Sequence, residues 1–208
     1  SHADLAGIPF NMYYMDSGVK KYNEETVTRD YMWAVPQLNT DITNPANIPV
    51  EMTFSHLMTY LEFGIAKVYS GPTVTVRQIE FTIDSGRKFI TGGTYDATNG
   101  TVTPLEETDT FVVTYDKNVT STSTATYFSI IMPELSCAPD DSDDATISAK
   151  FIFDDHDQGL DFQEGGTYTF KLSEVSSVDG KGLLAGKKYS VAIRISNVVK
   201  YGGAPQIM

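Results

Sequence analysis

The sequence predicts an all-β protein, folded as an antiparallel sandwich of two sheets. Apolar and polar residues alternate with a period of two along most of its 208 residues, which is typical of half-buried strands. Turn-forming residues separate the alternating segments, and no amphipathic helix of normal length interrupts them. These features indicate roughly nine or ten short strands around one core.

The N-terminal part is predicted to hold one strand followed by irregular chain. The strand places four apolar residues on one side: Ile8, Phe10, Met12 and Tyr14. A turn at residues 16–18 ends it, and the polar residues 19–30 are predicted to form a loop. A short apolar stretch at residues 31–35 is closed by Pro36. Residues 36–49 hold three prolines and several Asn and Asp residues, so we expect a long irregular connection there.

The segment after this connection predicts a corner of the sandwich. Residues 50–54 and 61–65 alternate in the same phase, but residues 56–60 break the pattern. A break of this length between two strands indicates one helical turn or a wide bulge. Strand 74–83 follows a Gly71-Pro72 turn and has a predicted phase slip near Gln78.

The remaining strands are bounded by clear turn signals. Residues 84–86 are a predicted turn, and Asn99-Gly100 predicts a tight hairpin. Residues 117–126 are polar and rich in Thr and Ser, and Pro133 is expected to stop the strand before it. Alternation predicts strands at residues 111–115, 127–133, 147–153, 168–172 and 189–195.

Composition and charge exclude several classes of function. The formal net charge of −12 repels phosphate backbones and anionic lipid headgroups, so we expect no nucleic-acid partner. The single cysteine, Cys137, rules out an internal disulfide and is expected to be a small buried apolar residue. No apolar stretch is long enough for a membrane-spanning helix, and no signal peptide opens the sequence. Ser1-His2 is expected to be a cloning remnant.

The histidines and acidic runs do not form a persuasive site. His56 is expected to be a partly buried histidine bonded to nearby backbone, since no second histidine or cysteine lies at ligand spacing. His156 lies in the acidic turn 154–159, which fits a calcium loop poorly. Residues 138–144 are a second acidic run, interpreted as a solvated loop. The adjacent Glu106 and Glu107 are interpreted as loop residues.

No known catalytic or cofactor motif is present. The sequence lacks a G-x-S-x-G elbow, a Walker A loop and a G-x-G-x-x-G turn. A sugar-binding platform would need exposed aromatics, and four in-phase tyrosines are interpreted instead as core or sheet-face residues: Tyr95, Tyr115, Tyr168 and Tyr189. We predict no enzyme, with no catalytic residue, no cofactor-binding residue, no metal site and no cofactor.

Four stretches, taken in order, resemble the fimbrillin family, the subunits and anchors of type V pili in Bacteroides-type bacteria. They are residues 30–34 with 50–63 (DYMWA, then VEMTFSHLMTYLEF), residues 93–100, the strand Phe128–Pro133 (FSIIMP), and residues 184–189 (LAGKKY) with the strand that follows. Their order and spacing agree with the family over about residues 30–196.

The resemblance implies a transthyretin-like, Greek-key β-sandwich at the cell surface, exported to the outer membrane as a lipoprotein precursor. It also implies donor-strand exchange, in which a neighbouring subunit's strand fills a groove left by removal of an N-terminal strand. Family members commonly carry two such domains, and this chain is expected to hold one. Arg29 and Lys20-Lys21 lie in loop-like sequence but mark no transferable processing site.

We therefore divide the chain into an N-terminal strand and loop (1–29), a fimbrillin-type sandwich (30–196) and a C-terminal tail or exchange strand (197–208). The expected function is that of a non-enzymatic structural or adhesive pilus subunit or anchor. Its partners would be other pilus subunits or itself. Residues 8–14 and 189–201 are the predicted exchange strands, so deletion of residues 197–208 should impair assembly but not folding. The alternative is an outer-membrane sandwich that binds glycans or host proteins.

Overall fold

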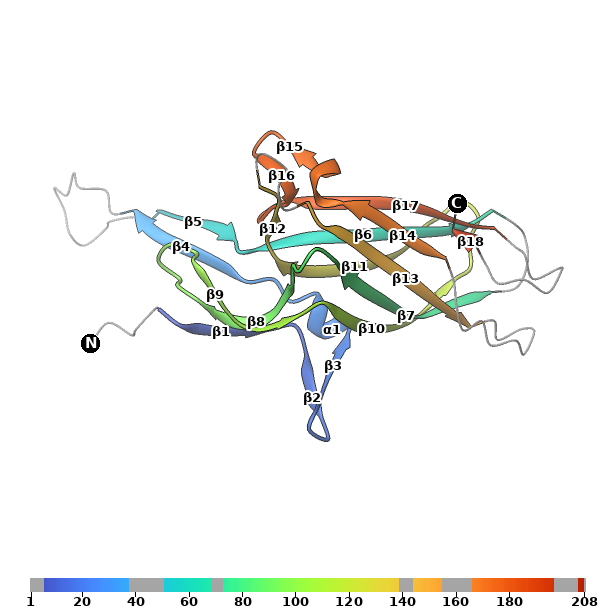
Figure 1. The fold of residues 1–208 in the computed structure, drawn as a ribbon, viewed down its shortest axis with the longest axis horizontal. Helices are drawn as coiled ribbons and strands as arrows, with labels where there is room; N and C mark the ends of the chain where they lie inside the picture. The colour runs from blue at the N-terminus through green and yellow to red at the C-terminus, as the bar shows by residue number, and fades with distance from the viewer. Residues whose placement is uncertain are drawn as a thin grey trace.

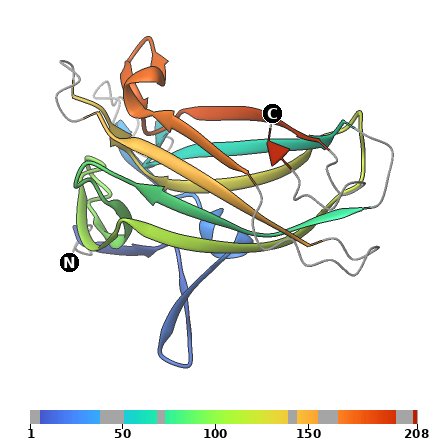
Figure 2. The ribbon, with the colours of Figure 1, turned by 45° about the vertical axis from the view of Figure 1, so that its right-hand side comes forward.

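The computed structural model describes residues 6–37, 51–68, 73–138, 144–154, 166–196 and 206–207. Within these ranges the chain is almost entirely strand, with one short helix, α1 (Glu24–Val27), and one 3₁₀ turn, η1 (Leu172–Glu174). Two main sheets form two layers over a shared core, and three small sheets flank them (Figures 1 and 2). The predicted all-β sandwich is confirmed.

The first main sheet has six strands. Their order is β14 (Thr167–Lys171), β13 (Thr146–Asp154), β7 (Val74–Ile83), β10 (Thr110–Val119), β3 (Val19–Asn23) and β2 (Tyr14–Asp16). The three central strands, β13, β7 and β10, bury alternate residues against the second sheet, as the sequence pattern predicts.

The second main sheet has four strands. Their order is β11 (Thr126–Pro133), β6 (Met58–Lys67), β17 (Lys188–Ser196) and β18 (Gln206–Ile207). Pro133 is the last residue of β11, which agrees with its predicted role as a strand stop. Phe63 of β6 lies at the centre of the sandwich, where its ring contacts Phe81 of β7 and Phe151 of β13. Ring pairs of this kind join the two layers.

Both main sheets are largely antiparallel, but each contains one parallel pair. β17 runs parallel to β6, and β10 runs parallel to β3. Parallel neighbours need a long connection between them, so they are set by distant packing and leave no hairpin signal in the sequence. Alternation predicts β6, β10 and β17, but it predicts neither β3 nor these pairings.

The three small sheets extend the sandwich. One is β1 (Ile8–Asn11), β8 (Phe89–Tyr95) and β9 (Val102–Thr108), another is β12 (Leu135–Ser136), β16 (Gly180–Leu183) and β15 (Ser176–Ser177), and the third is the ribbon of β4 (Met32–Gln37) with β5 (Glu51–His56). The predicted hairpin at Asn99-Gly100 joins β8 to β9, although its loop covers residues 96–101. Glu106 and Glu107 lie in β9, so their interpretation as loop residues is wrong.

The predicted phase slip near Gln78 is a β-bulge. Arg77 is the extra residue, because Gln78 and Val76 pair with the consecutive residues Ile152 and Phe153 of β13. Against β10 the register also shifts at this point, but there Arg77 faces two residues, Tyr115 and Asp116, so the extra residue lies on β10. The Arg77 guanidinium lies 3.0 Å from a carboxylate oxygen of Asp116, which the bulge places at a positive φ of 50°.

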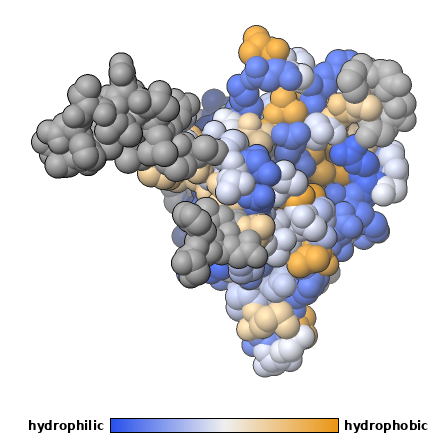
Figure 3. Space-filling model, turned by 90° about the vertical axis from the view of Figure 1, so that its left-hand side faces the viewer, coloured by the Kyte–Doolittle hydropathy of each residue, from blue (hydrophilic) through white to orange (hydrophobic). Residues whose placement is uncertain are grey.

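The loop predicted at residues 19–30 is wrong. Residues 14–23 form the hairpin of β2 and β3, which projects from the sandwich and carries exposed Tyr14, Met15 and Val19 (Figures 1 and 3). Helix α1 follows, capped by the Asn23 side chain. Cross-strand pairing overrides the polar composition here. Lys20 and Lys21 therefore lie in a strand.

The predicted corner is tighter than the sequence suggests. β5 ends at His56 and β6 begins at Met58, so Leu57 alone separates them, and no helical turn is present there. The first strand ends before Tyr14, and β4 continues through Pro36 to Gln37. Most of the predicted connection 36–49, Gly71-Pro72, residues 139–143 and 155–165, and most of the tail lie outside the described residues.

Candidate functional site

The exposed long edge of β17 is the first candidate site. Tyr60 N–H donates to Lys187 C=O at 2.9 Å, and Val68 N–H donates to Ile195 C=O at 3.0 Å. Odd-numbered residues of β17 therefore point their backbone groups at β6. Neighbouring residues alternate, so Ser190, Ala192 and Arg194 point theirs away from β6. Among the described residues, β18 pairs only with Ile195 and Ser196 on this side.

A groove lined by both apolar and polar residues runs beside this edge. It has a volume of about 380 Å³ and lies between β17, at one side of the four-stranded sheet, and β14, the edge strand of the six-stranded sheet. Tyr168 and Phe170 of β14 and Tyr189 and Val191 of β17 line it, with Leu61 of β6 on its floor. Tyr168, Tyr189 and Val191 are only partly buried. The sandwich is therefore incompletely closed on this side.

Charged groups hold the start of β17 in place. Lys188 Nζ lies 3.0 Å from a carboxylate oxygen of Glu62, which is buried in β6 and also accepts hydrogen bonds from Tyr60 and Ser190. The hydrogen bond to Glu62 raises the pKa of the Lys188 ammonium. This strand is thus anchored to β6, while its other edge pairs, among the described residues, with β18 at its last two residues alone.

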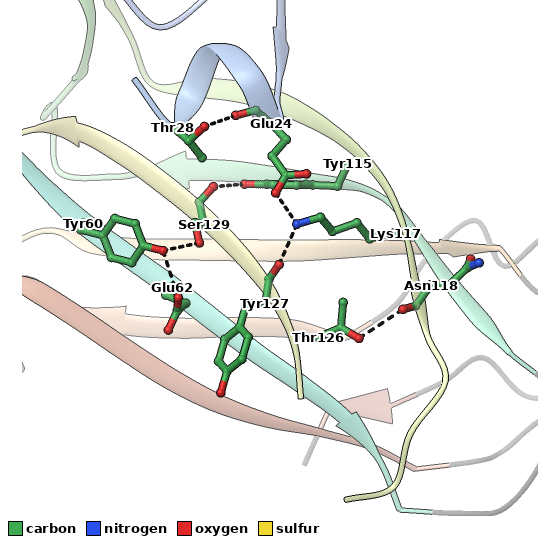
Figure 4. Close-up of polar contacts among 10 residues, drawn as sticks. All are labelled: Glu24, Thr28, Tyr60, Glu62, Tyr115, Lys117, Asn118, Thr126, Tyr127 and Ser129. Carbon is green, nitrogen blue, oxygen red and sulfur yellow. Dashed lines mark hydrogen bonds and ion pairs between the residues drawn. The ribbon is translucent and has the colours of Figure 1, made fainter. Parts of the chain in front are cut away.

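The opposite edge of the same sheet, β11, is blocked by side chains from β10 (Figure 4). Tyr115 donates its hydroxyl hydrogen to the Ser129 carbonyl at 2.8 Å, and Lys117 Nζ donates to the Tyr127 carbonyl at 3.0 Å. Both carbonyls point away from β6, because both residues have the same parity in β11. Burial raises the pKa of the Tyr115 hydroxyl, so it remains a donor at neutral pH.

Helix α1 completes the cover over β11. Glu24, in its first turn, pairs with Lys117, and the helix lies against β11 (Figure 4). The pair places the lysine ammonium between a carboxylate and the strand carbonyl. Sequence reasoning missed Tyr115, Lys117 and Glu24 as a group, since the pair Glu24 and Lys117 is 93 residues apart and no local pattern links them.

The second candidate site is the corner at His56. Its Nδ1 lies 2.6 Å from a carboxylate oxygen of Asp30, and the imidazole is about half exposed, at 52%. The expectation of a partly buried histidine bonded to backbone is therefore wrong: the partner is a carboxylate. Asp30 precedes β4 and His56 ends β5, so this contact joins the two strands of the ribbon at the end that leads into β6.

Residues from all four stretches that carry the family resemblance converge at this corner. Two hollows of about 220 and 280 Å³ flank His56. Asp30 and Lys188 line the first hollow. The second is lined by Trp33, Gly100, Pro133 and Ala185. These positions come from segments spread over most of the sequence, and the fold brings them together.

The other residues singled out in the sequence are not gathered into a site. Cys137 is buried, as expected. Asp144 holds η1, accepting from Ser173 N–H at 2.9 Å and from its hydroxyl at 2.7 Å, and these bonds lower the pKa of Asp144. His156 lies outside the described residues. Glu106 pairs with Lys20.

The described residues contain neither a cluster of metal ligands nor a membrane-spanning helix. In the described ranges, no group of three or more His, Cys, Asp and Glu side chains lies close enough to hold a metal ion. Among the same residues, no helix has the length and apolar character needed to cross a lipid bilayer.

Three solved structures from Bacteroides, each described as a candidate cell adhesion protein, are similar to this chain. The one from B. uniformis shares 16% identity over 86% of this chain and 65% of its own, with a TM-score of 0.40. The one from B. eggerthii shares 13% identity over 100% and 65%, with a TM-score of 0.41. The one from B. ovatus shares 13% identity over 85% and 58%, with a TM-score of 0.35.

The chain thus spans less than two thirds of the length of these solved structures. No curated protein sequence matches it. The family model described as fimbrillin-like, however, matches residues 9–207, which is nearly the whole chain. The described fold is the all-β sandwich that the sequence resemblance implied. On this match, the chain belongs to the fimbrillin-like family.

Proposed function

We propose that this protein is a non-enzymatic structural and adhesive subunit of a fimbria on the bacterial surface. Subunits would join when a strand from one copy, or from another pilus protein, adds to the open edge of β17. Export to the outer membrane as a lipoprotein precursor belongs to the same proposal. The observation that carries it is the combination, on one side of the sandwich, of a backbone edge that has little strand pairing among the described residues and an adjacent groove lined partly by apolar side chains.

An incoming strand would gain both backbone and side-chain contacts. Ser190, Ala192 and Arg194 present N–H and C=O groups that a new strand can pair with, as in other cases of β-strand addition. Alternate side chains of that strand would enter the groove between Tyr168 and Val191. Each buried Val, Leu or Ile contributes about 1.5–3 kcal/mol, so two or three are enough to hold the strand.

Residues 197–208 are the proposed donor. In the described part of this segment, residues 206–207, β18 pairs with two residues of β17, and leaving would break these two backbone pairings. The other predicted exchange strand, residues 8–14, is more firmly held, because β1 pairs with β8 along four residues and buries Phe10. The division into residues 1–29, 30–196 and 197–208 follows this proposal, although β3 joins residues 19–23 to the six-stranded sheet.

A peptide of residues 197–208 tests the proposal. It should bind saturably to a chain ending at Ser196, measured by fluorescence anisotropy, and a peptide of the same residues in scrambled order should not. The shortened chain should unfold as cooperatively as the full chain. If it does not fold, the tail is a core strand and cannot be the donor; if both peptides bind equally, the groove does not select this strand.

A further inference from the structure

We propose that the two hollows beside His56 form one binding site for a small saccharide. This site does not depend on strand addition. His56 borders both hollows, and so does one turn, which places Gly186 in the first hollow and Ala185 in the second. Together the hollows enclose the volume of a small ligand.

The Asp30–His56 pair fixes the hydrogen-bonding character of the imidazole. An ionised carboxylate only accepts hydrogen bonds, so Nδ1 of His56 carries the hydrogen that it donates to Asp30. In the neutral imidazole, Nε2 is then an acceptor, and the half-exposed ring makes it accessible. A ligand hydroxyl can donate to this atom.

Further groups around the hollows suit a polyhydroxylated ring. Glu134, on the rim of the second hollow, has an exposed side chain and uses one carboxylate oxygen to accept from Ala185 N–H at 3.1 Å. Trp33 and Tyr60 add aromatic surface, one in each hollow, and Met58 and Ile131 add aliphatic surface. A sugar ring has hydroxyls at its edge and C–H groups on its faces, which match this mixture.

The charges of the corner argue against other ligand classes. Each basic group already has an acidic partner: His56 with Asp30, Lys188 with Glu62, and Lys187 with Asp179. An anion would therefore find no unpaired positive charge in these groups. A purely apolar ligand would cover Nε2 of His56 and the carboxylate of Glu134 without offering them a hydrogen bond in place of water, which is unfavourable. A neutral saccharide avoids both costs.

The single tryptophan provides a direct readout, because Trp33 gives the only indole signal of the protein. We would titrate the ¹⁵N-labelled full chain with methyl glycosides of glucose, galactose, mannose and N-acetylglucosamine. At least one should shift the Trp33 indole and Gly186 amide signals saturably. A ligand that fills hollows of this size is expected to bind with a Kd of about 1–10 mM.

Two variants and one control locate the binding. His56→Ala removes the neutral Nε2 acceptor, and Glu134→Gln removes the charged carboxylate acceptor. Each variant should weaken saccharide binding at least about fivefold. Glu107→Gln, an exposed glutamate of β9, should leave it unchanged. Glu134→Gln retains an acceptor for Ala185 N–H, so it serves even if His56→Ala fails to fold. The proposal is overturned if none of the glycosides shifts the Trp33 signal saturably up to about 100 mM, or if Glu107→Gln weakens binding as much as Glu134→Gln.

Discussion

The two sides of the four-stranded sheet differ in how far their strand edges are covered by other parts of the chain. At β11, side chains of Tyr115 and Lys117 donate to two outward carbonyls, and α1 lies over the strand (Figure 4). At β17, the outward groups of Ser190, Ala192 and Arg194 have no strand partner among the described residues, and a groove lined partly by apolar side chains lies beside them. An unpaired strand edge is a template for another strand, so proteins usually cover it. Here the β11 edge is covered and the β17 edge can still pair with an added strand. Under the proposed strand addition, subunits would therefore join in a single direction.

The largest effect is expected from Ala192→Pro at the open edge. Proline removes the outward N–H in the middle of β17 and leaves the hydrogen bonds to β6 intact. Binding of the 197–208 peptide should weaken at least about tenfold, while the free energy of unfolding changes by less than about 1 kcal/mol. Anisotropy and urea unfolding measure the two quantities. Ala192→Ser is the control, and equal binding by both variants would show that the strand adds elsewhere.

Tyr115→Phe should have the next largest effect, and it acts on the covered edge. The change leaves the Ser129 carbonyl without its donor in a buried environment, which costs about 1–3 kcal/mol of unfolding free energy. Urea unfolding measures the loss. Tyr127→Phe removes an exposed hydroxyl from β11, the strand that contains Ser129, and should cost less than about 0.5 kcal/mol of unfolding free energy. Similar losses of unfolding free energy in both variants would mean that the hydrogen bond to the Ser129 carbonyl contributes no more to stability than an exposed hydroxyl does.

Lys117→Met should have a smaller effect on stability but should expose the β11 edge. The pair with Glu24 is partly solvated, so its loss costs about 1 kcal/mol or less. The Tyr127 carbonyl would then be free to pair with another chain, and self-association should rise, as measured by analytical ultracentrifugation. Lys21→Met, on the projecting hairpin, is the control for added surface apolarity. If both variants self-associate equally, the edge is not protected by Lys117.

The smallest effect concerns Asp144, which fixes η1 next to the groove. Hydrogen bonds from Ser173 hold the pKa of Asp144 below its ordinary value of 3.8. The resulting stability is present above that value and is lost as pH falls through the lower, folded-state pKa. Asp144→Asn should therefore flatten the stability profile below about pH 4. Unfolding midpoints measured between about pH 2 and 7 test this, and an unchanged slope would contradict it.

Local sequence patterns predicted much of the fold. Alternation placed the inward residues of β7, β10 and β13, and the slip near Gln78 marks a real bulge. It failed at residues 19–30, where polar residues form β3 and α1, and at His56, which bonds to Asp30 instead of backbone. The partner of His56, Asp30, is remote in sequence, and so is β10, which pairs with the end of β3. The start of β3 instead pairs with its sequence neighbour β2, although the polar residues there carry no alternation.

The sequence by itself determined the central strands of the six-stranded sheet, β7, β10 and β13, and which of their faces are buried, because a period of two is a local property of the chain. It also carried the ordered stretches that mark the family. The tertiary structure decided which strand edges are covered. The donors that close β11, the groove that borders β17 and the residues that meet at His56 come from distant segments. Their hydrogen bonds form only after the two sheets have packed, so no local pattern encodes them.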